Sequence, residues 1–237
     1  MNNKKGSHVG FVISFVLFVT FIIFVYVILS SRVDFGQEKA NSLSYVKAEI
    51  INRVSENLTS VSIAIGQQNP QSCVQLTDFF SKTGLGDRFV VADDSGNVLP
   101  SGKGGNDLFI EKNNNLFFRV YGSEEFNSSG GALNNCQPLN ENSQGYILGL
   151  SRDSREIFES KVLELFENYT ENYEALKIDM KISSVDEFGF RFTYSNGTEI
   201  KIPEKNVTIN VYADRTAVQY IKADATRESG FIDTIVW

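Results

Sequence analysis

The pattern of apolar positions begins with one uninterrupted block. Residues Val9 to Ser30 form twenty-two consecutive positions without a charged side chain. At about 1.5 Å of rise per residue, a helix of that length crosses the ~30 Å hydrocarbon layer of a bilayer. The block is too long for a signal-peptide core, and no small-residue cleavage site follows it. The pattern therefore predicts a short basic cytoplasmic segment over residues 1–8 and a retained transmembrane helix over residues 9–30.

A second helical pattern follows the apolar block. Between about Gln37 and Ile65, apolar residues recur every three or four positions, with charged residues between them. That period places them on one face of a helix. Gly66 and Pro70 are helix-ending residues. The sequence predicts an amphipathic helical stalk over residues 31–66 that continues the transmembrane helix. Its apolar stripe consists of Leu43, Val46, Ile50, Val54, Leu58 and Val61.

The pattern then changes to short strands. The DDSG turn sequence at residues 93–96 separates two extended pieces and predicts a hairpin over residues 88–99. A second hairpin is predicted over residues 108–121, then a long polar loop over 122–144 and a strand over 146–150. These elements together predict a strand-rich extracellular lobe over residues 67–150.

The last part of the chain predicts a second extracellular lobe, over residues 151–237. Asp153 and Glu156 have capping-box spacing before an apolar helical face that ends near Tyr173. Strands are predicted from residue 177 onward, and the Asn-Gly turn makes a hairpin over residues 188–202. The predicted fold is thus a single-pass membrane protein, with a long N-terminal α-helix before an α+β extracellular domain with antiparallel strands.

Charge gives the expected orientation. The net charge is −7, and Lys4, Lys5 and Arg32 account for +3, so the other residues carry −10. Two lysines before the apolar block stand against Arg32 and Lys39 after it, which is nearly balanced. Because a short basic tail is easily retained, we expect the N-terminus in the cytoplasm and the large part outside. The lipid bilayer is an expected partner, and an acidic outer domain argues against nucleic acid.

The two cysteines, Cys73 and Cys136, both lie in the outer part. In an oxidising compartment they are expected to form a disulfide, worth roughly 4 kcal/mol for a loop of this length. Two buried thiols are the alternative. Five N-x-S/T triplets are compatible with glycosylation of the outer part, at Asn57, Asn127, Asn168, Asn196 and Asn206.

The residues give no support for catalysis. His8, at the membrane edge, is the single histidine, which excludes Ser-His-Asp and Cys-His nucleophiles in the outer domain. The stretch from Gly96 to Lys103 fails the phosphate-loop spacing. Asp93, Asp94 and Asn97 fit a hairpin turn better than a calcium loop. We predict no catalytic, cofactor-binding or metal-binding residues and no enzyme; an anchored enzyme is the weakest interpretation.

Lys4, Lys5 and Gly6 before a long apolar helix resemble the class III signal peptide of archaeal type IV pilins and pilin-like proteins. The resemblance implies recognition of these residues by a membrane peptidase that cuts between Gly6 and Ser7. It also implies self-association through the N-terminal helix, as in the core of a surface filament. Many pilins carry a glutamate at the fifth mature position, where this chain has Phe11.

The sequence supports two alternative functions. The first is a membrane-anchored surface protein of pilin-like type, structural or adhesive and non-catalytic. The second rests on residues 88–99, RFVVADDSGNVL, which resemble the strand–turn–strand of extracytoplasmic sensor domains of the Cache/PAS kind. That resemblance implies a bitopic membrane-anchored ligand-binding or sensor-type ectodomain that acts through a partner.

Overall fold

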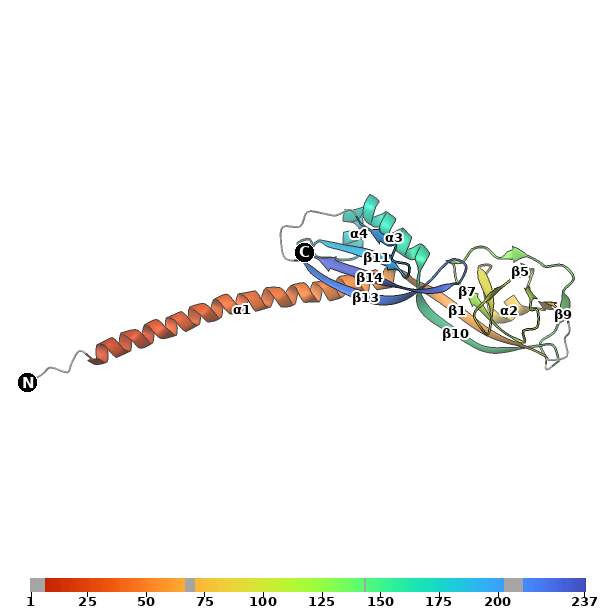
Figure 1. Ribbon diagram of the computed structural model, residues 1–237, viewed down its shortest axis with the longest axis horizontal. Helices are drawn as coiled ribbons and strands as arrows, with labels where there is room; N and C mark the ends of the chain where they lie inside the picture. Colours follow the sequence, from red (N-terminus) through yellow and green to blue (C-terminus); the bar gives the residue numbers. More distant parts are fainter. Residues whose placement is uncertain (1–6, 67–70, 143, 203–210) are drawn as a thin grey trace, which may run out of the picture.

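A long helix leads into two β-rich lobes that lie one behind the other (Figure 1). The computed structural model describes residues 7–66, 71–142, 144–202 and 211–237, and the side chains within them except those of residues 7–8 and 29–37. Helix α1 (Ser7–Arg53) enters the first of these lobes, which we call the proximal lobe. The second lobe, which lies farthest from the N-terminus, is the distal lobe. The prediction of a long N-terminal helix followed by a domain with antiparallel strands is confirmed.

One nine-stranded sheet joins the two lobes. Its order is β12-β11-β14-β13-β10-β1-β7-β3-β4, and every pairing is antiparallel except the short one between β10 and β13. The long strands β1 and β10 pair with each other and pass from one lobe to the other (Figure 1). The strands are β1 (Ser55–Ile65), β3 (Phe89–Asp93), β4 (Val98–Leu99), β7 (Phe117–Gly122), β10 (Tyr146–Phe158), β11 (Phe188–Tyr194), β12 (Glu199–Lys201), β13 (Tyr212–Ile221) and β14 (Arg227–Val236).

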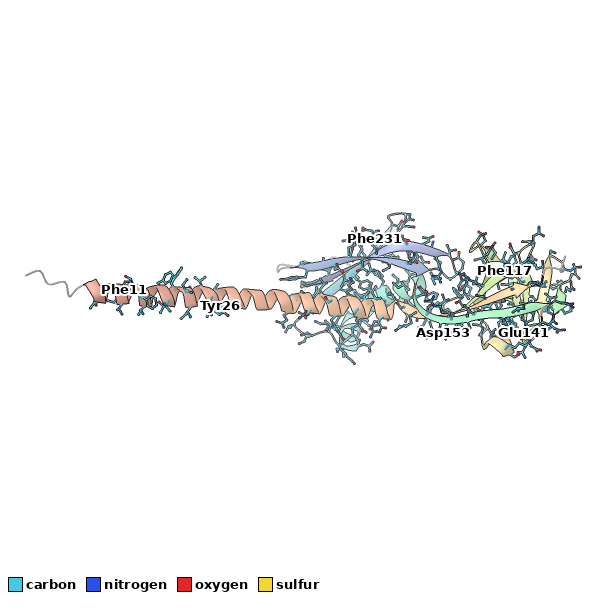
Figure 2. The ribbon with its side chains drawn as sticks, turned by 90° about the horizontal axis from the view of Figure 1, so that it is seen from below. Phe11, Tyr26, Phe117, Glu141, Asp153 and Phe231 are labelled. Carbon is cyan, nitrogen blue, oxygen red and sulfur yellow. A yellow bond between two sulfur atoms is a disulfide. The ribbon has the colours of Figure 1, made fainter. Side chains whose placement is uncertain are left out.

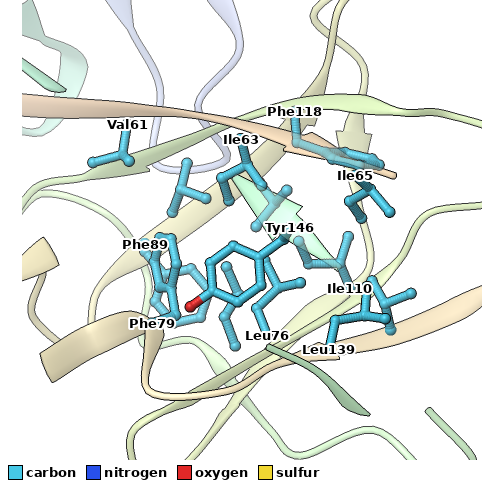
Figure 3. Close-up of a cluster of buried hydrophobic side chains, with 14 of the residues drawn as sticks. Val61, Ile63, Ile65, Leu76, Phe79, Phe89, Ile110, Phe118, Leu139 and Tyr146 are labelled. Carbon is cyan, nitrogen blue, oxygen red and sulfur yellow. The ribbon is translucent and has the colours of Figure 1, made fainter. Parts of the chain in front are cut away.

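The distal lobe is closed by a second, five-stranded sheet of order β8-β5-β6-β2-β9. Tyr146 lies at the centre of the apolar core of this lobe (Figure 3) and is fully buried. Its hydroxyl donates a hydrogen bond of 2.7 Å to the carbonyl of Thr77, so the buried polar group is satisfied. The elements are β2 (Cys73–Leu76), α2 (Phe79–Thr83), β5 (Ser101–Gly104), β6 (Asp107–Glu111), β8 (Gly130–Gly131) and β9 (Gln137–Leu139).

The proximal lobe packs three helices against the sheet. The last turns of α1 bury Val46 and Ile50 among residues of α3 (Glu159–Glu171), α4 (Tyr173–Asp179) and strands β11, β13 and β14. Phe231 lies on the face of the sheet that is turned away from α1 (Figure 2). The apolar stripe predicted before residue 54 therefore fixes α1 to the sheet.

The predicted helical stalk ends too late, because α1 stops at Arg53 and residues 55–65 form β1. Leu58 and Val61 fit the helical spacing, but Val61, Ile63 and Ile65 also alternate, and all three point into the distal core. β-branched side chains favour extended backbone. Pairing with β7 on one side and β10 on the other then makes β1 an interior strand.

The predicted boundary between residues 150 and 151 is also wrong as an element boundary, because β10 runs through it. Asp153 and Glu156 are strand residues opposite Thr59 and Glu56, so they do not cap a helix. The helix expected there begins at Glu159.

Two further strand predictions fail and two succeed. The stretch 177–182 lies at the end of α4 and after it, and no strand forms there. In place of the hairpin predicted over residues 108–121, β6 and β7 form over residues 107–111 and 117–122, but they belong to different sheets and make no hairpin. The hairpins over residues 88–99 and 188–202 are confirmed as β3–β4 and β11–β12. Residues 207–210, in the part of the chain after residue 177 where strands are expected, lie outside the described residues.

Candidate functional site

The N-terminal part of α1 is apolar on all sides. Residues Val9–Ile28 meet the length and composition of a membrane-crossing helix, and none of that stretch is buried inside the protein. Phe11 is 73% exposed and Tyr26 71% (Figure 2). The hydroxyl of Thr20 donates back to the carbonyls of Val16 and Leu17, which satisfies it within the helix. This helix could anchor the protein in a membrane.

Helix α1 is fixed to the proximal lobe by charged contacts where it reaches the sheet. Asp186 accepts hydrogen bonds of 2.5 Å from Lys39 Nζ and from Ser42 Oγ. Burial by itself would raise the pKa of the Asp186 carboxyl, but the Lys39 and Ser42 hydrogen bonds outweigh it and hold the pKa below its ordinary value. Farther along the helix, Lys47 Nζ lies 2.7 Å from Asp214 Oδ2.

The predicted processing residues lie at the edge of the structure. Lys4, Lys5 and Gly6 are outside the described residues. Ser7 is the first residue of α1. The proposed cut between Gly6 and Ser7 would therefore release the segment that precedes the helix.

The predicted disulfide is confirmed. Cys73 and Cys136 are bonded across 63 residues. The bond joins β2 to the residue just before β9, which are neighbours in the five-stranded sheet. It therefore ties the polar segment 122–144 to the distal lobe.

The asparagines of the predicted glycosylation triplets lie on the surface wherever they are described. Asn57, Asn127, Asn168 and Asn196 are exposed, and they belong to β1, a loop, α3 and the β11–β12 turn. Asn206 lies outside the described residues. The exposed asparagines are accessible to a modifying enzyme.

In the acidic turn of the first hairpin, the Asp93 side chain forms hydrogen bonds that stabilise the turn. The carboxylate of Asp93 accepts hydrogen bonds from the backbone of Ser95 and from both the backbone and the side chain of Asn97. The Asn97 side-chain bond is the main reason why the pKa of Asp93 is lowered. Within the described ranges, no group of three or more His, Cys, Asp or Glu side chains could hold a metal ion.

A groove of about 520 Å³ lies where β1, β7 and β10 meet Arg227 of the proximal lobe. The strand register places Ser60 of β1 between Tyr121 of β7 and Arg152 of β10. Ser62, two positions along β1, lies opposite Arg119 of β7. Short side chains on the central strand and long ones on its neighbours produce a trough along β1.

A bulge in β10 shapes the rim of the groove. Val61 pairs with Ser151 and Ile63 with Leu148, so two residues of β10, Gly149 and Leu150, oppose the single residue Ser62. A β-carbon at Gly149 would lie 3.1 Å from Ser62 Cβ, which leaves little room for a side chain there. Leu150 is 83% exposed and lines the groove. Bulges commonly redirect side chains in this way.

Three arginines and one carboxylate line the groove. Arg119 and Arg152 form no ion pair and no side-chain hydrogen bond with any residue that the structure describes. Arg227 lies 3.9 Å from Glu156 and 5.8 Å from the ring centroid of Tyr121. The groove is therefore locally positive in a chain whose net charge is −7.

Sequence reasoning missed this groove entirely. Its arginines come from β7, β10 and β14, which are distant in the sequence. No motif or charge run connects them, and the helix predicted from residue 153 would have removed part of one wall. Strand register is the information that brings these side chains together, and no local signal contains it.

Comparisons of this chain with protein-family models, curated proteins and solved structures gave no match.

Proposed function

We propose that the chain is a membrane-anchored extracellular surface protein of pilin-like type, structural or adhesive and non-catalytic. The observation that carries the proposal is the single helix α1, which joins an apolar segment exposed on all sides to the core of the ectodomain. At about 1.5 Å per residue, its 47 residues extend for roughly 70 Å. Such a helix would display both lobes at a fixed position above the membrane, N-terminus inside.

Self-association through the same helix is part of this proposal. In lipid, helices associate by side-chain packing and not by release of apolar surface from water. The exposed aromatic and β-branched residues of Val9–Ile28 give α1 a large surface for that packing. Phe11, where many pilins carry a glutamate, would contribute apolar contact in place of a charge.

Processing at Gly6 tests the proposal. Wild-type protein, isolated from cells that contain a class III signal peptidase, should have an intact mass that lacks residues 1–6. Gly6→Leu should leave the full N-terminus in place. Gly10→Leu is the matched control, because a β-carbon at Gly10 meets nothing within 4 Å. Finding the same uncleaved N-terminus in all three proteins would refute the pilin-like proposal.

The groove supports the second candidate, a bitopic ligand-binding or sensor-type ectodomain that acts through a partner. A ligand that binds the folded state should raise the melting temperature, by an amount that grows with the logarithm of its concentration relative to its Kd. That assay needs the full chain, because a fragment that begins at residue 67 would lack β1, an interior strand of the nine-stranded sheet. A thermal shift without processing at Gly6 would favour this candidate over the first.

A further inference from the structure

Two arginines of the groove, Arg119 and Arg152, differ from the other arginines of the ectodomain. Arg155 donates to Asn52, Arg215 lies 2.7 Å from Asp233, and Arg53 lies 2.7 Å from Asp179. These guanidinium groups stabilise the fold. In the described part of the chain, Arg119 and Arg152 have no such partner, so their charge is available to a ligand.

The geometry places this charge on both sides of one trough. Arg119 and Arg152 stand on the two neighbours of β1, opposite Ser62 and Ser60. With strands ~4.8 Å apart and ~3.3 Å of rise per residue, their α-carbons are separated by roughly 12 Å. Two guanidinium groups therefore border the serine floor, and Arg227 approaches it from the proximal lobe.

This arrangement favours a ligand with several acid groups. A guanidinium group presents a planar fork of donors that matches the two oxygens of a carboxylate. Three such groups around one trough can engage acid groups that repeat along a chain. Glu156 already accepts a hydrogen bond from Ser154 and lies beside Arg227, so it opposes only one of the three arginines.

The lining favours a saccharide over a peptide. Four of its ten residues carry hydroxyl groups, namely Ser60, Ser62, Ser154 and Tyr121. The backbone of β1 is bonded to β7 and β10 on its two sides, so the floor of the trough offers no free strand edge to a peptide. The groove offers little apolar surface to a hydrophobic side chain of a peptide, since Leu58 is buried and Leu150 is the exposed aliphatic residue of the lining.

We propose that this groove binds an acidic polysaccharide through the carboxylates of its uronic acid units. This inference specifies the class of ligand that an adhesive ectodomain would bind, and in that respect it rests on the proposed function. Binding itself depends on the folded ectodomain and not on processing at Gly6.

Calorimetric titration of the full chain in phosphatidylcholine nanodiscs tests the proposal. The probes are a hexamer of galacturonate, the neutral hexamer maltohexaose and a hexaglutamate peptide. We expect the galacturonate hexamer to bind and its affinity to fall with added salt, because the contacts are ionic and near the surface. Maltohexaose should show no binding.

Arginine variants locate the site. Arg119→Gln and Arg152→Gln should each weaken binding of the galacturonate hexamer about tenfold, as expected for loss of a charged hydrogen-bonding group. Both should still fold, because neither side chain has a partner among the described residues. The control is Arg191→Gln on β11, which removes the same charge from an arginine paired with Glu199 outside the groove. Its affinity should stay within about twofold of wild type, as expected of a group that makes no contact with the ligand.

Three outcomes would overturn the proposal. One is no binding of the galacturonate hexamer by wild-type protein. Another is equal weakening by Arg191→Gln, which would indicate a diffuse charge effect. The third is equal or tighter binding of hexaglutamate, which would make the groove a site for acidic peptides. If the intact mass still lacks residues 1–6, these results refute the ligand and leave the proposed function standing.

Discussion

The guanidinium group of Arg155 on β10 donates two hydrogen bonds to Asn52 near the end of α1, at 2.5 Å to Oδ1 and at 3.0 Å to the backbone carbonyl. A third bond, of 2.9 Å, reaches the carbonyl of Ser55. These carbonyls flank the turn at which the helix becomes β1. The last carbonyls of a helix lack partners within it, and here a side chain from the neighbouring strand supplies them.

Arg155→Met should therefore destabilise the junction between helix and sheet. Loss of these bonds at an exposed site should cost about 1–2 kcal/mol. For a domain of this size, that lowers the melting temperature by about 2–4 °C per kcal/mol. Thermal unfolding in nanodiscs can be followed by the fluorescence of Trp237, the single tryptophan.

Arg152→Met is the matched control for this change. It removes the same group from the same strand, but the Arg152 side chain forms no hydrogen bond or ion pair with any residue described. Its melting temperature should remain within about 1–2 °C of wild type, the range of a neutral surface substitution. If both variants lowered the melting temperature equally, the hydrogen bonds of Arg155 would contribute nothing specific.

The sequence predicts the parts of this fold that depend on local pattern. The apolar block and the stripe through Val54 predict α1, because each forms a regular helical period. Hairpins centred on turn residues are also found, as at Gly197, where the backbone takes a φ of 82° that suits glycine. Composition and compartment are enough to predict the Cys73–Cys136 bond.

The wrong predictions concern segments whose secondary structure depends on pairing with strands that are distant in the sequence. Val61 satisfies both the helical stripe and an alternating pattern with Ile63 and Ile65, and pairing with β7 and β10 selects the strand. Ile178, Met180 and Ile182 alternate like strand residues, yet Ile178 is 76% exposed at the end of α4. The groove could not be predicted for the same reason, because the register of paired strands is what brings its residues together.

Asp186 should make stability depend on pH. Its pKa in the folded protein lies below the ordinary value of about 3.9 for an unfolded chain. Stability from the Lys39 contact is thus complete above the unfolded pKa and is lost as pH falls through the folded pKa. The melting temperature of Asp186→Asn should be below that of wild type at pH 7, and the difference should shrink towards pH 3.

Asp94→Asn provides the control for this titration. Asp94 is exposed, and its side chain forms no ion pair or hydrogen bond with the described residues. Its melting temperature should follow that of wild type at every pH. A gap between wild type and Asp186→Asn that stayed constant from pH 7 to pH 3 would show that the charge of Asp186 is not what stabilises the junction.

Removal of the disulfide should act on the distal lobe. Cys73→Ser with Cys136→Ser should cost roughly 4 kcal/mol in the chain-entropy account of a 63-residue separation. The bond lies in the five-stranded sheet, whose buried residues form a core separate from that of the proximal lobe. Hydrogen exchange should accelerate in β2, β6 and β9 while β11 and β14 keep their protection. Equal acceleration in both lobes would contradict this separation.

Lys177 and Glu187 form an ion pair of the proximal lobe in which the lysine is buried and the Glu187 side chain is about one-third exposed. Lys177 is only 5% exposed, and its Nζ donates at 2.7 Å to Glu187 Oε1 and at 3.3 Å to the carbonyl of Ser184. Glu187 also accepts a hydrogen bond from the Tyr173 hydroxyl. Glu187→Gln should destabilise the protein by about 2 kcal/mol, because it removes the charged partner that Lys177 Nζ contacts and leaves the Asp186 carboxylate as the nearby counter-charge.

The double variant separates pairing from burial. Lys177→Met with Glu187→Gln removes both charges and keeps the hydrocarbon of the lysine stem in the core. It should therefore be more stable than Glu187→Gln alone. A double-mutant cycle of unfolding free energies, completed by Lys177→Met, should give a coupling of about 1–3 kcal/mol between the two sites. Additive effects of the two substitutions would mean that the lysine charge is solvated in the folded protein. In that case the Tyr173 hydrogen bond, and not the ion pair, would be the contribution of Glu187 to the proximal lobe.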